Sequence, residues 1–90
     1  MPALYGFAYL DTALKYLEAL PSAKLRGQIK RKIELLASNP MPPKSKKLHG
    51  VTDEGNSVYR VRSGDYRILY SVRGIIIVIL DINHRKDVYR

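Results

Sequence analysis

Three arginines and three tyrosines fall within residues 59–70, whose sequence is YRVRSGDYRILY. The arginines are Arg60, Arg62 and Arg67, and Gly64-Asp65 lies between the second and the third. An arginine side chain stays protonated and presents a planar set of N–H donors that matches the oxygens of a phosphate. The stretch therefore has the chemistry of a phosphate-binding site, provided that the fold brings the three guanidinium groups together.

Residue alternation around Gly64-Asp65 predicts a β-hairpin, and glycine at the first turn position suits a type II′ turn. With a two-residue turn, Arg62 lies opposite Arg67 and Arg60 lies opposite Leu69. Because side chains alternate between the two faces of a strand, these four residues share one face. The opposite face, which must meet the core, carries the mainly apolar set Tyr59, Val61, Ile68 and Tyr70.

Two like charges directly opposite each other destabilise a sheet, so the facing arginines are a local conflict. Such conflicts are expected at functional sites. A phosphate bound between the two side chains would replace their repulsion by charge-assisted hydrogen bonds. The alternative is that a carboxylate of Asp65, Asp81 or Asp87 neutralises them.

The rest of the chain predicts the elements that support this hairpin. Residues 4–8 predict a short strand, and Asp11 or Thr12 suits the N-cap of a helix that Pro21 ends. Ser22 caps a second amphipathic helix, which Asn39-Pro40 ends. Residues 41–56 predict a loop, and strands are predicted at 58–63, 66–73 and 75–82.

This order of elements predicts one α+β domain over residues 1–90. We expect a helical hairpin on one face of a mostly antiparallel four-stranded sheet, in the order β-α-α-β-β-β. The last strand, almost wholly apolar, is predicted to be covered on both faces.

The composition limits the classes of function. Sixteen Lys and Arg oppose eight Asp and Glu, a net charge of +8, which favours nucleic acid or an acidic protein as partner, although a solvated basic surface is the alternative. The chain lacks cysteine, and its two histidines are far apart, so no metal-ligand set or other cofactor is predicted. We see neither a signal peptide nor a membrane-spanning run and expect a cytoplasmic protein.

Four motifs carry a resemblance to a known family. They are KLHG at 47–50, VYRVRSGDYRILYSV at 58–72, the apolar strand that follows, and HRKDVYR at 84–90. Together they resemble the RelE/ParE superfamily of bacterial and archaeal toxins, over the whole chain. The resemblance implies the RelE-like fold and a cognate antitoxin as partner. The two chains would assemble in a complex such as a toxin–antitoxin heterotetramer.

The superfamily has two activities: RelE-type toxins cut mRNA in the ribosomal A site, whereas ParE-type toxins inhibit DNA gyrase. RelE-type members place basic residues where this chain has Arg60, Arg67 and Arg85, and several carry a tyrosine where it has Tyr89. These matches favour the RNA-cutting branch, with the 70S ribosome and its mRNA as partners. Further RNA or ribosome contacts are assigned to Lys44, Lys46, Lys47, Arg62, His84 and Lys86.

In that branch the 2′-hydroxyl of the RNA attacks the adjacent phosphorus without a metal ion. We expect Arg67 to stabilise the charge that develops on the phosphoryl oxygens, and Arg60 and Arg85 to position the backbone. Tyr89 would act as a phenolate or stack on a base, or else pack on the sheet edge. His84 is an acid candidate or an ordinary surface histidine.

Two alternatives stay open. One is a ParE-type inhibitor of gyrase, and the other is an inactive member that acts only as an antitoxin-bound corepressor. Val58 stands where some members carry a lysine, and no equivalent of a carboxylate base is evident. The sequence therefore does not assign the general acid or base.

Overall fold

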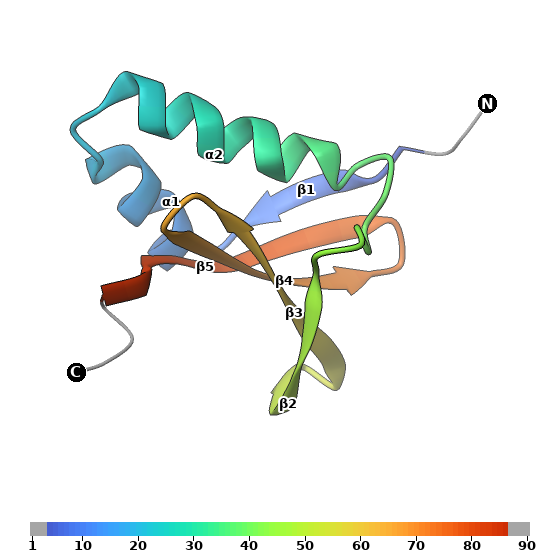
Figure 1. Ribbon diagram of the computed structural model, residues 1–90. Helices are drawn as coiled ribbons and strands as arrows, with labels where there is room; N and C mark the ends of the chain where they lie inside the picture. The colour runs from blue at the N-terminus through green and yellow to red at the C-terminus, as the bar shows by residue number, and fades with distance from the viewer. Residues whose placement is uncertain (1–3, 87–90) are drawn as a thin grey trace.

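The computed structural model describes residues 4–86. Two helices lie on one face of a five-stranded sheet with strand order β1-β5-β4-β3-β2 (Figure 1). Strand β1 is parallel to β5, and every other neighbouring pair is antiparallel. The elements are β1 (Gly6–Tyr9), α1 (Asp11–Ala19), α2 (Ala23–Leu35), β2 (Lys46–Asp53), β3 (Asn56–Ser63), β4 (Tyr66–Arg73) and β5 (Ile76–His84).

The predicted α+β architecture is confirmed, but the predicted number of strands is wrong. The predicted loop 41–56 contains an additional edge strand, β2. Most of its side chains are exposed, and its pairing with β3 shifts register between Lys47 and Thr52. Gly50 lies in this interval with φ +75°. An exposed, irregular edge strand lacks the apolar alternation by which a strand is predicted.

The predicted hairpin register is confirmed in full. Ser63 pairs with Tyr66, Arg62 with Arg67, and Arg60 with Leu69. Gly64 has φ +59°, as the first position of a type II′ turn requires. Strand β4 has the predicted bounds, whereas β3 begins two residues earlier than predicted.

One of the two predicted helix caps is confirmed. The Ser22 hydroxyl accepts a hydrogen bond from the Leu25 N–H at 3.2 Å at the start of α2. The N-cap of α1 is Leu10, with no capping side chain, so the prediction of Asp11 or Thr12 is wrong. Asp11 instead lies in the first turn, where its negative charge interacts favourably with the positive end of the helix dipole. Helix α2 ends at Leu35, before the predicted stop.

The core lies between the helices and the sheet. On β5 the consecutive residues Ile77, Val78 and Ile79 are all buried, so the middle of this strand is covered on both faces as predicted, whereas Ile75, just before it, and Ile76 at its start are exposed. The main cluster joins apolar residues of α1 and α2 to the inner face of the sheet: Ala13, Leu17, Ile29, Ile33, Leu36, Val61, Ile68, Tyr70, Ile77, Ile79 and Ile82.

A β-bulge in β5 changes which residues face the core. Leu69 pairs with Asp81 and Tyr70 pairs with Ile79, so Leu80 is an extra residue in β5. As a result Ile79 and Ile82 both enter the core although they are three positions apart. Asp81 and Asn83 are thereby turned to the sheet face that points away from the helices.

The β2–β3 hairpin bends away from the helices, and its turn is tied to the end of β4 (Figure 1). The Asp53 carboxylate accepts hydrogen bonds from the Ser71 hydroxyl at 2.7 Å and from Arg73 Nε at 3.0 Å. Arg73 also forms an ion pair with Glu54 at 2.9 Å. Within residues 4–86, no helix is long and apolar enough to cross a membrane.

Candidate functional site

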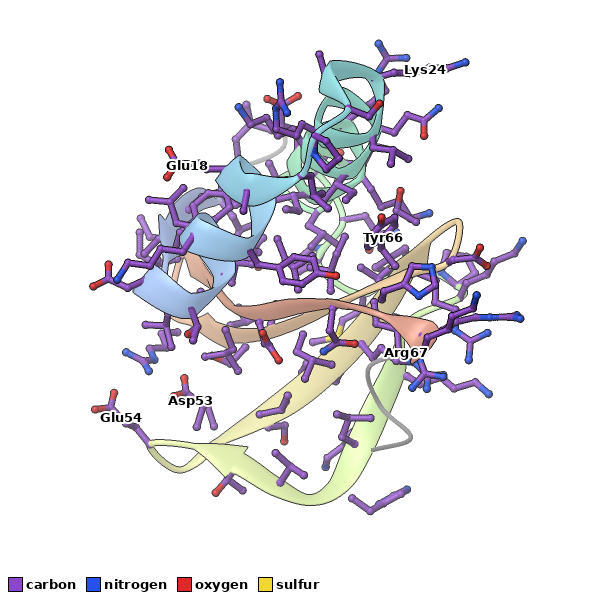
Figure 2. All side chains as sticks on the ribbon, turned by 90° about the vertical axis from the view of Figure 1, so that its left-hand side faces the viewer. Glu18, Lys24, Asp53, Glu54, Tyr66 and Arg67 are labelled. Atoms are coloured by element: carbon purple, nitrogen blue, oxygen red, sulfur yellow. The ribbon has the colours of Figure 1, made fainter. Side chains whose placement is uncertain are left out.

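Strands β2, β3 and β4 together place a row of cations on the sheet face away from the helices. Lys46 pairs with Arg60, and Arg62 pairs with Arg67, so these side chains share this face by strand alternation. We call Lys46, Arg60, Arg62 and Arg67 the arginine face. In Figure 2, Arg67 lies among several side chains that end in nitrogen, far from Asp53 and Glu54 at the other end of the molecule.

Two adjoining hollows open on the arginine face. The larger, of about 500 Å³, lies at the β3–β4 turn and is lined by Arg62, Gly64, Asp65, Arg67, Arg85 and Lys86. The smaller, of about 200 Å³, is lined by Leu48, Arg60, Arg67, Leu69 and Asn83. Arg67 lines both hollows and is therefore the central cation of the site.

Arg85 joins the larger hollow through the backbone just after β5. Its N–H donates to the Asp65 carbonyl at 2.8 Å, which ties the segment after β5 to the β3–β4 turn. The Arg85 side chain is 63% exposed, and its Nε lies 3.9 Å from an Asp65 carboxylate oxygen. This loose ion pair leaves the guanidinium group able to turn toward an anion.

The arginine face carries a positive charge that its surroundings do not balance. Among the described residues, no carboxylate forms an ion pair with Arg60, Arg62 or Arg67. Burial, and then the positive charges of Arg62 and Arg67, lower the pKa of the Arg60 guanidinium. An anion in the hollows would relieve this repulsion.

The carboxylates proposed as neutralising partners are engaged elsewhere or lie outside the described residues. Asp65 lies beside Arg85 and His84. Asp81 accepts hydrogen bonds from the Ile82 N–H at 2.9 Å and from Asn83 Nδ2 at 3.1 Å. Asp87 is outside residues 4–86. Within the described chain, Asp65 thus partly balances Arg85, whereas no carboxylate forms an ion pair with Arg60, Arg62 or Arg67.

Asn83 is a residue of this site that sequence analysis missed. It pairs across the sheet with Arg67, and its side-chain Oδ1 is buried without a hydrogen-bond partner. Arg67 Nε is likewise buried without a partner. No residue pattern in the sequence marks Asn83, because its pairing with Arg67 depends on the bulge at Leu80.

Several predicted RNA-binding residues do not join the arginine face. Lys47 pairs with Tyr59 and follows its side of the sheet, opposite to Lys46. His84 pairs with Tyr66, and their rings meet edge to face at 5.1 Å on the helix side of the sheet. His84 Nδ1 accepts the Lys86 N–H at 3.1 Å. The proposed acid is therefore on the other face from Arg67.

The remaining predicted residues are placed as follows. Lys44 is exposed in the turn before β2, and Lys86 lines the larger hollow. Tyr89 lies outside the described residues. Within residues 4–86, no group of three or more His, Cys, Asp or Glu side chains could hold a metal ion.

Comparison with known proteins decides the family. Residues 7–89 match the family described as ParE toxin of type II toxin–antitoxin system, parDE. The candidate toxin RelE1 of Methanocaldococcus jannaschii is 40% identical over 82 residues, covering 86% of each chain. The chain belongs to the RelE/ParE superfamily of type II toxins.

Solved structures of this superfamily share the fold of the toxin. A RelE–RelB complex from Pyrococcus horikoshii matches with a TM-score of 0.75 and 30% identity, over 91% of this chain and 96% of that chain. A RelB–RelE antitoxin–toxin complex from Methanococcus jannaschii matches with a TM-score of 0.68 and 30% identity, over 90% and 93%. Free Escherichia coli RelE, at 23% identity and a TM-score of 0.69 over 93% and 86%, shares the fold.

Proposed function

We propose that this toxin is a ribosome-dependent endonuclease that cuts translated mRNA in the A site of the 70S ribosome. The observation that carries the proposal is the position of Arg67, which lines two adjoining hollows and, like Arg60 and Arg62, forms no ion pair with a described carboxylate. A phosphodiester fits this environment, because it supplies the missing negative charge and two oxygens for a planar guanidinium group.

In the proposed reaction the RNA supplies its own nucleophile. A bond forms between the 2′-oxygen and the adjacent phosphorus, and the bond from phosphorus to the 5′-oxygen of the next nucleotide breaks. One proton leaves the 2′-hydroxyl, and one reaches the departing 5′-oxygen. Arg67 stabilises the negative charge that grows on the phosphoryl oxygens, where a fixed donor acts most strongly.

The other residues of the site hold the substrate. Arg60 and Arg85 approach from opposite sides of Arg67, each through a different hollow, and position the RNA backbone. Arg62, Lys46 and Lys86 add contacts to phosphates on either side. Tyr89, which lies outside the described residues, is proposed to act as a phenolate or as a stacking platform for a base. His84 stays outside the proton transfers, because its ring packs against Tyr66.

The proposed partners follow from the charge and from the relatives. The Pyrococcus and Methanococcus relatives are each solved as a complex of RelE with RelB. We extend this to a cognate antitoxin for the present toxin, in an assembly such as a heterotetramer, within the cytoplasm. An acidic antitoxin segment suits the basic surface, as does ribosomal RNA.

The test compares induced expression of wild type, Arg67→Ala and Arg31→Ala in a bacterium without the antitoxin. Arg31 is an exposed residue of α2, so its replacement removes the same charge away from the arginine face. Primer extension on a translated reporter should show cuts within codons for wild type and Arg31→Ala. Those cuts should vanish with Arg67→Ala. Cleavage that persists with Arg67→Ala would contradict the proposal.

A second candidate function is inhibition of DNA gyrase, which the ParE description of the matching family favours. It predicts growth arrest with intact mRNA, accompanied by DNA cleavage complexes and an SOS response. Expression without any arrest would instead indicate an inactive member that serves as an antitoxin-bound corepressor.

A further inference from the structure

Two buried polar atoms of the site lack hydrogen-bond partners, and they belong to residues that face each other across the sheet. Arg67 Nε is a donor and Asn83 Oδ1 is an acceptor. The two residues are a register pair between β4 and β5. Buried polar groups in proteins are nearly always hydrogen-bonded, and those left without a partner call for an explanation. A donor and an acceptor on paired residues suggest that each is the missing partner of the other.

We propose that Asn83 is a positioning residue that holds the guanidinium group of Arg67 in the orientation needed to bind the scissile phosphate. This inference rests on the proposed RNA-cutting function. Arg67 Nε donates to Asn83 Oδ1 when the terminal nitrogens of Arg67 engage the phosphate. Hydrogen bonds of catalytic groups are often unformed in the free protein and tighten only when the substrate is bound.

A hydrogen bond to Asp81 fixes the orientation of the Asn83 amide. Asn83 Nδ2 donates to Asp81 Oδ2 at 3.1 Å. Since a carboxylate only accepts hydrogen bonds, the amide nitrogen must face Asp81 and the amide oxygen must be on the other side. Asp81 is itself held, because its Oδ1 accepts the Ile82 N–H at 2.9 Å. The chain of contacts therefore runs from the backbone through Asp81 and Asn83 toward Arg67.

This support matters because the described neighbours of Arg67 do not hold it by charge. No described carboxylate pairs with Arg67, so Coulomb attraction does not set its side-chain rotamer. Arg60 and Arg62 on the neighbouring strand β3 repel it instead. A neutral acceptor at Nε orients the guanidinium group without cancelling its charge. That property is what a phosphate-binding arginine needs, and an aspartate at this position would lose it.

The first experiment is a double-mutant cycle of Asn83→Ala and Arg67→Lys in single-turnover mRNA cleavage on programmed ribosomes. Lysine keeps the positive charge but has a methylene group in place of Nε. In the Arg67 background we expect Asn83→Ala to slow cleavage about 10- to 100-fold, as for other supporting residues, with little change in ribosome affinity. In the Arg67→Lys background it should have no further effect. Independent, multiplicative losses would overturn the proposal.

Asn56→Ala is the matched control, because Asn56 is the first residue of β3, next to the β2–β3 turn. Within residues 4–86 its side chain donates only to the Asp53 and Glu54 carbonyls. Its replacement should leave the cleavage rate unchanged. A loss of cleavage from Asn56→Ala equal to that from Asn83→Ala would show a general effect of stability and overturn the assignment.

The second experiment is independent of cleavage. The Nε–H signal of Arg67 is followed by NMR in the purified toxin, with and without a 2′-deoxy dinucleotide that cannot react. We expect the bound Nε–H to exchange with water more slowly in wild type than in Asn83→Ala. Equal exchange overturns the proposal, whether or not the toxin cuts RNA. Protected Nε–H in a toxin that cuts no RNA would sustain the contact while rejecting the proposed function.

Discussion

Arg62 lies directly opposite Arg67 across the β3–β4 hairpin, and one further pair, Ser63 with Tyr66, separates them from the turn. Directly opposed like charges weaken a hairpin, and no described carboxylate lies close enough to form an ion pair with either side chain. The hairpin nevertheless forms because its other face buries Val61, Ile68 and Tyr70. Burial of apolar side chains on one face thus offsets the electrostatic repulsion on the other. The unbalanced positive charge that remains favours binding of an anion.

Arg62→Ala should separate stability from activity. Removing one of the facing charges should raise the free energy of unfolding at low salt, by up to about 1 kcal/mol. Cleavage of mRNA should fall, because a phosphate contact is lost. Urea denaturation at low and high salt checks the first claim, since screening should remove the gain. Arg31→Ala is the control, and a clear loss of stability in Arg62→Ala would contradict the interpretation.

The two adjacent lysines at the start of β2 should differ in their effect on RNA binding. Lys46 pairs with Arg60 on the arginine face, whereas Lys47 pairs with Tyr59 and points to the opposite side. We expect Lys46→Ala to reduce the slope of log affinity against log salt by about 0.7 for single-stranded RNA, the value for one phosphate contact. Lys47→Ala is its neighbour and control. Equal slopes for the two variants would show that the strand faces do not govern RNA contact.

The Asp53 carboxylate should make stability depend on pH. Hydrogen bonds from Ser71 and Arg73 lower the pKa of Asp53 below its ordinary value of 3.8. Because the folded pKa is below the unfolded one, this stabilisation is present above the unfolded pKa and is lost as pH falls through the folded pKa.

Asp53→Asn should therefore lower the free energy of unfolding by about 1 kcal/mol at neutral pH. The difference from wild type should shrink below about pH 4, where the wild-type carboxyl also becomes neutral. Urea denaturation across this range measures it. Glu18→Gln, an exposed change on α1, supplies the control. A difference that stays constant down to acid pH would refute the role of the charge.

Tyr70 should anchor the segment that carries Lys44. Its buried hydroxyl donates to the Pro40 carbonyl at 2.6 Å, and burial raises the pKa of the phenol. Tyr70→Phe should lower the free energy of unfolding by about 1 kcal/mol or somewhat more, since the Pro40 carbonyl loses its donor. Thermal denaturation measures this change. Tyr5→Phe is the control, because Tyr5 is partly buried and its hydroxyl forms no hydrogen bond within residues 4–86. Unchanged stability would show that water replaces the tyrosine at Pro40.

The sequence was sufficient for the hairpin and for most of the fold. Alternation and a glycine turn determine the pairing of Arg62 with Arg67, because a register slip of one residue would place arginines in the core. The Ser22 cap and the two helices likewise depend on local residue patterns. These parts of the structure depend on short-range residue patterns, such as alternation and helical periodicity, which can be recognised in the sequence.

The parts that were missed depend on neighbours that are distant in sequence. Strand β2 is stabilised by its pairing with β3 and by Asp53 contacts to Ser71 and Arg73, none of which leaves an alternating pattern. Asn83 was missed because the predicted strand ended at Ile82, whereas β5 continues to His84 and pairs Asn83 with Arg67. His84 was considered as an acid because histidine titrates near neutral pH, whereas the bulge at Leu80 places its ring beside Tyr66.

The extra residue at Leu80 therefore sets the phase of everything that follows it in β5. If Leu80 instead took a regular place in the pairing, the amide of Asn83 would turn inward and the imidazole of His84 would lie on the same side as the phosphate-binding guanidinium groups. Straightening the bulge at unchanged chain length would therefore exchange a neutral hydrogen-bond acceptor for a titratable ring on that face. The presence or absence of one bulge in this way determines which proton chemistry this sheet face offers its substrate, with no side chain replaced.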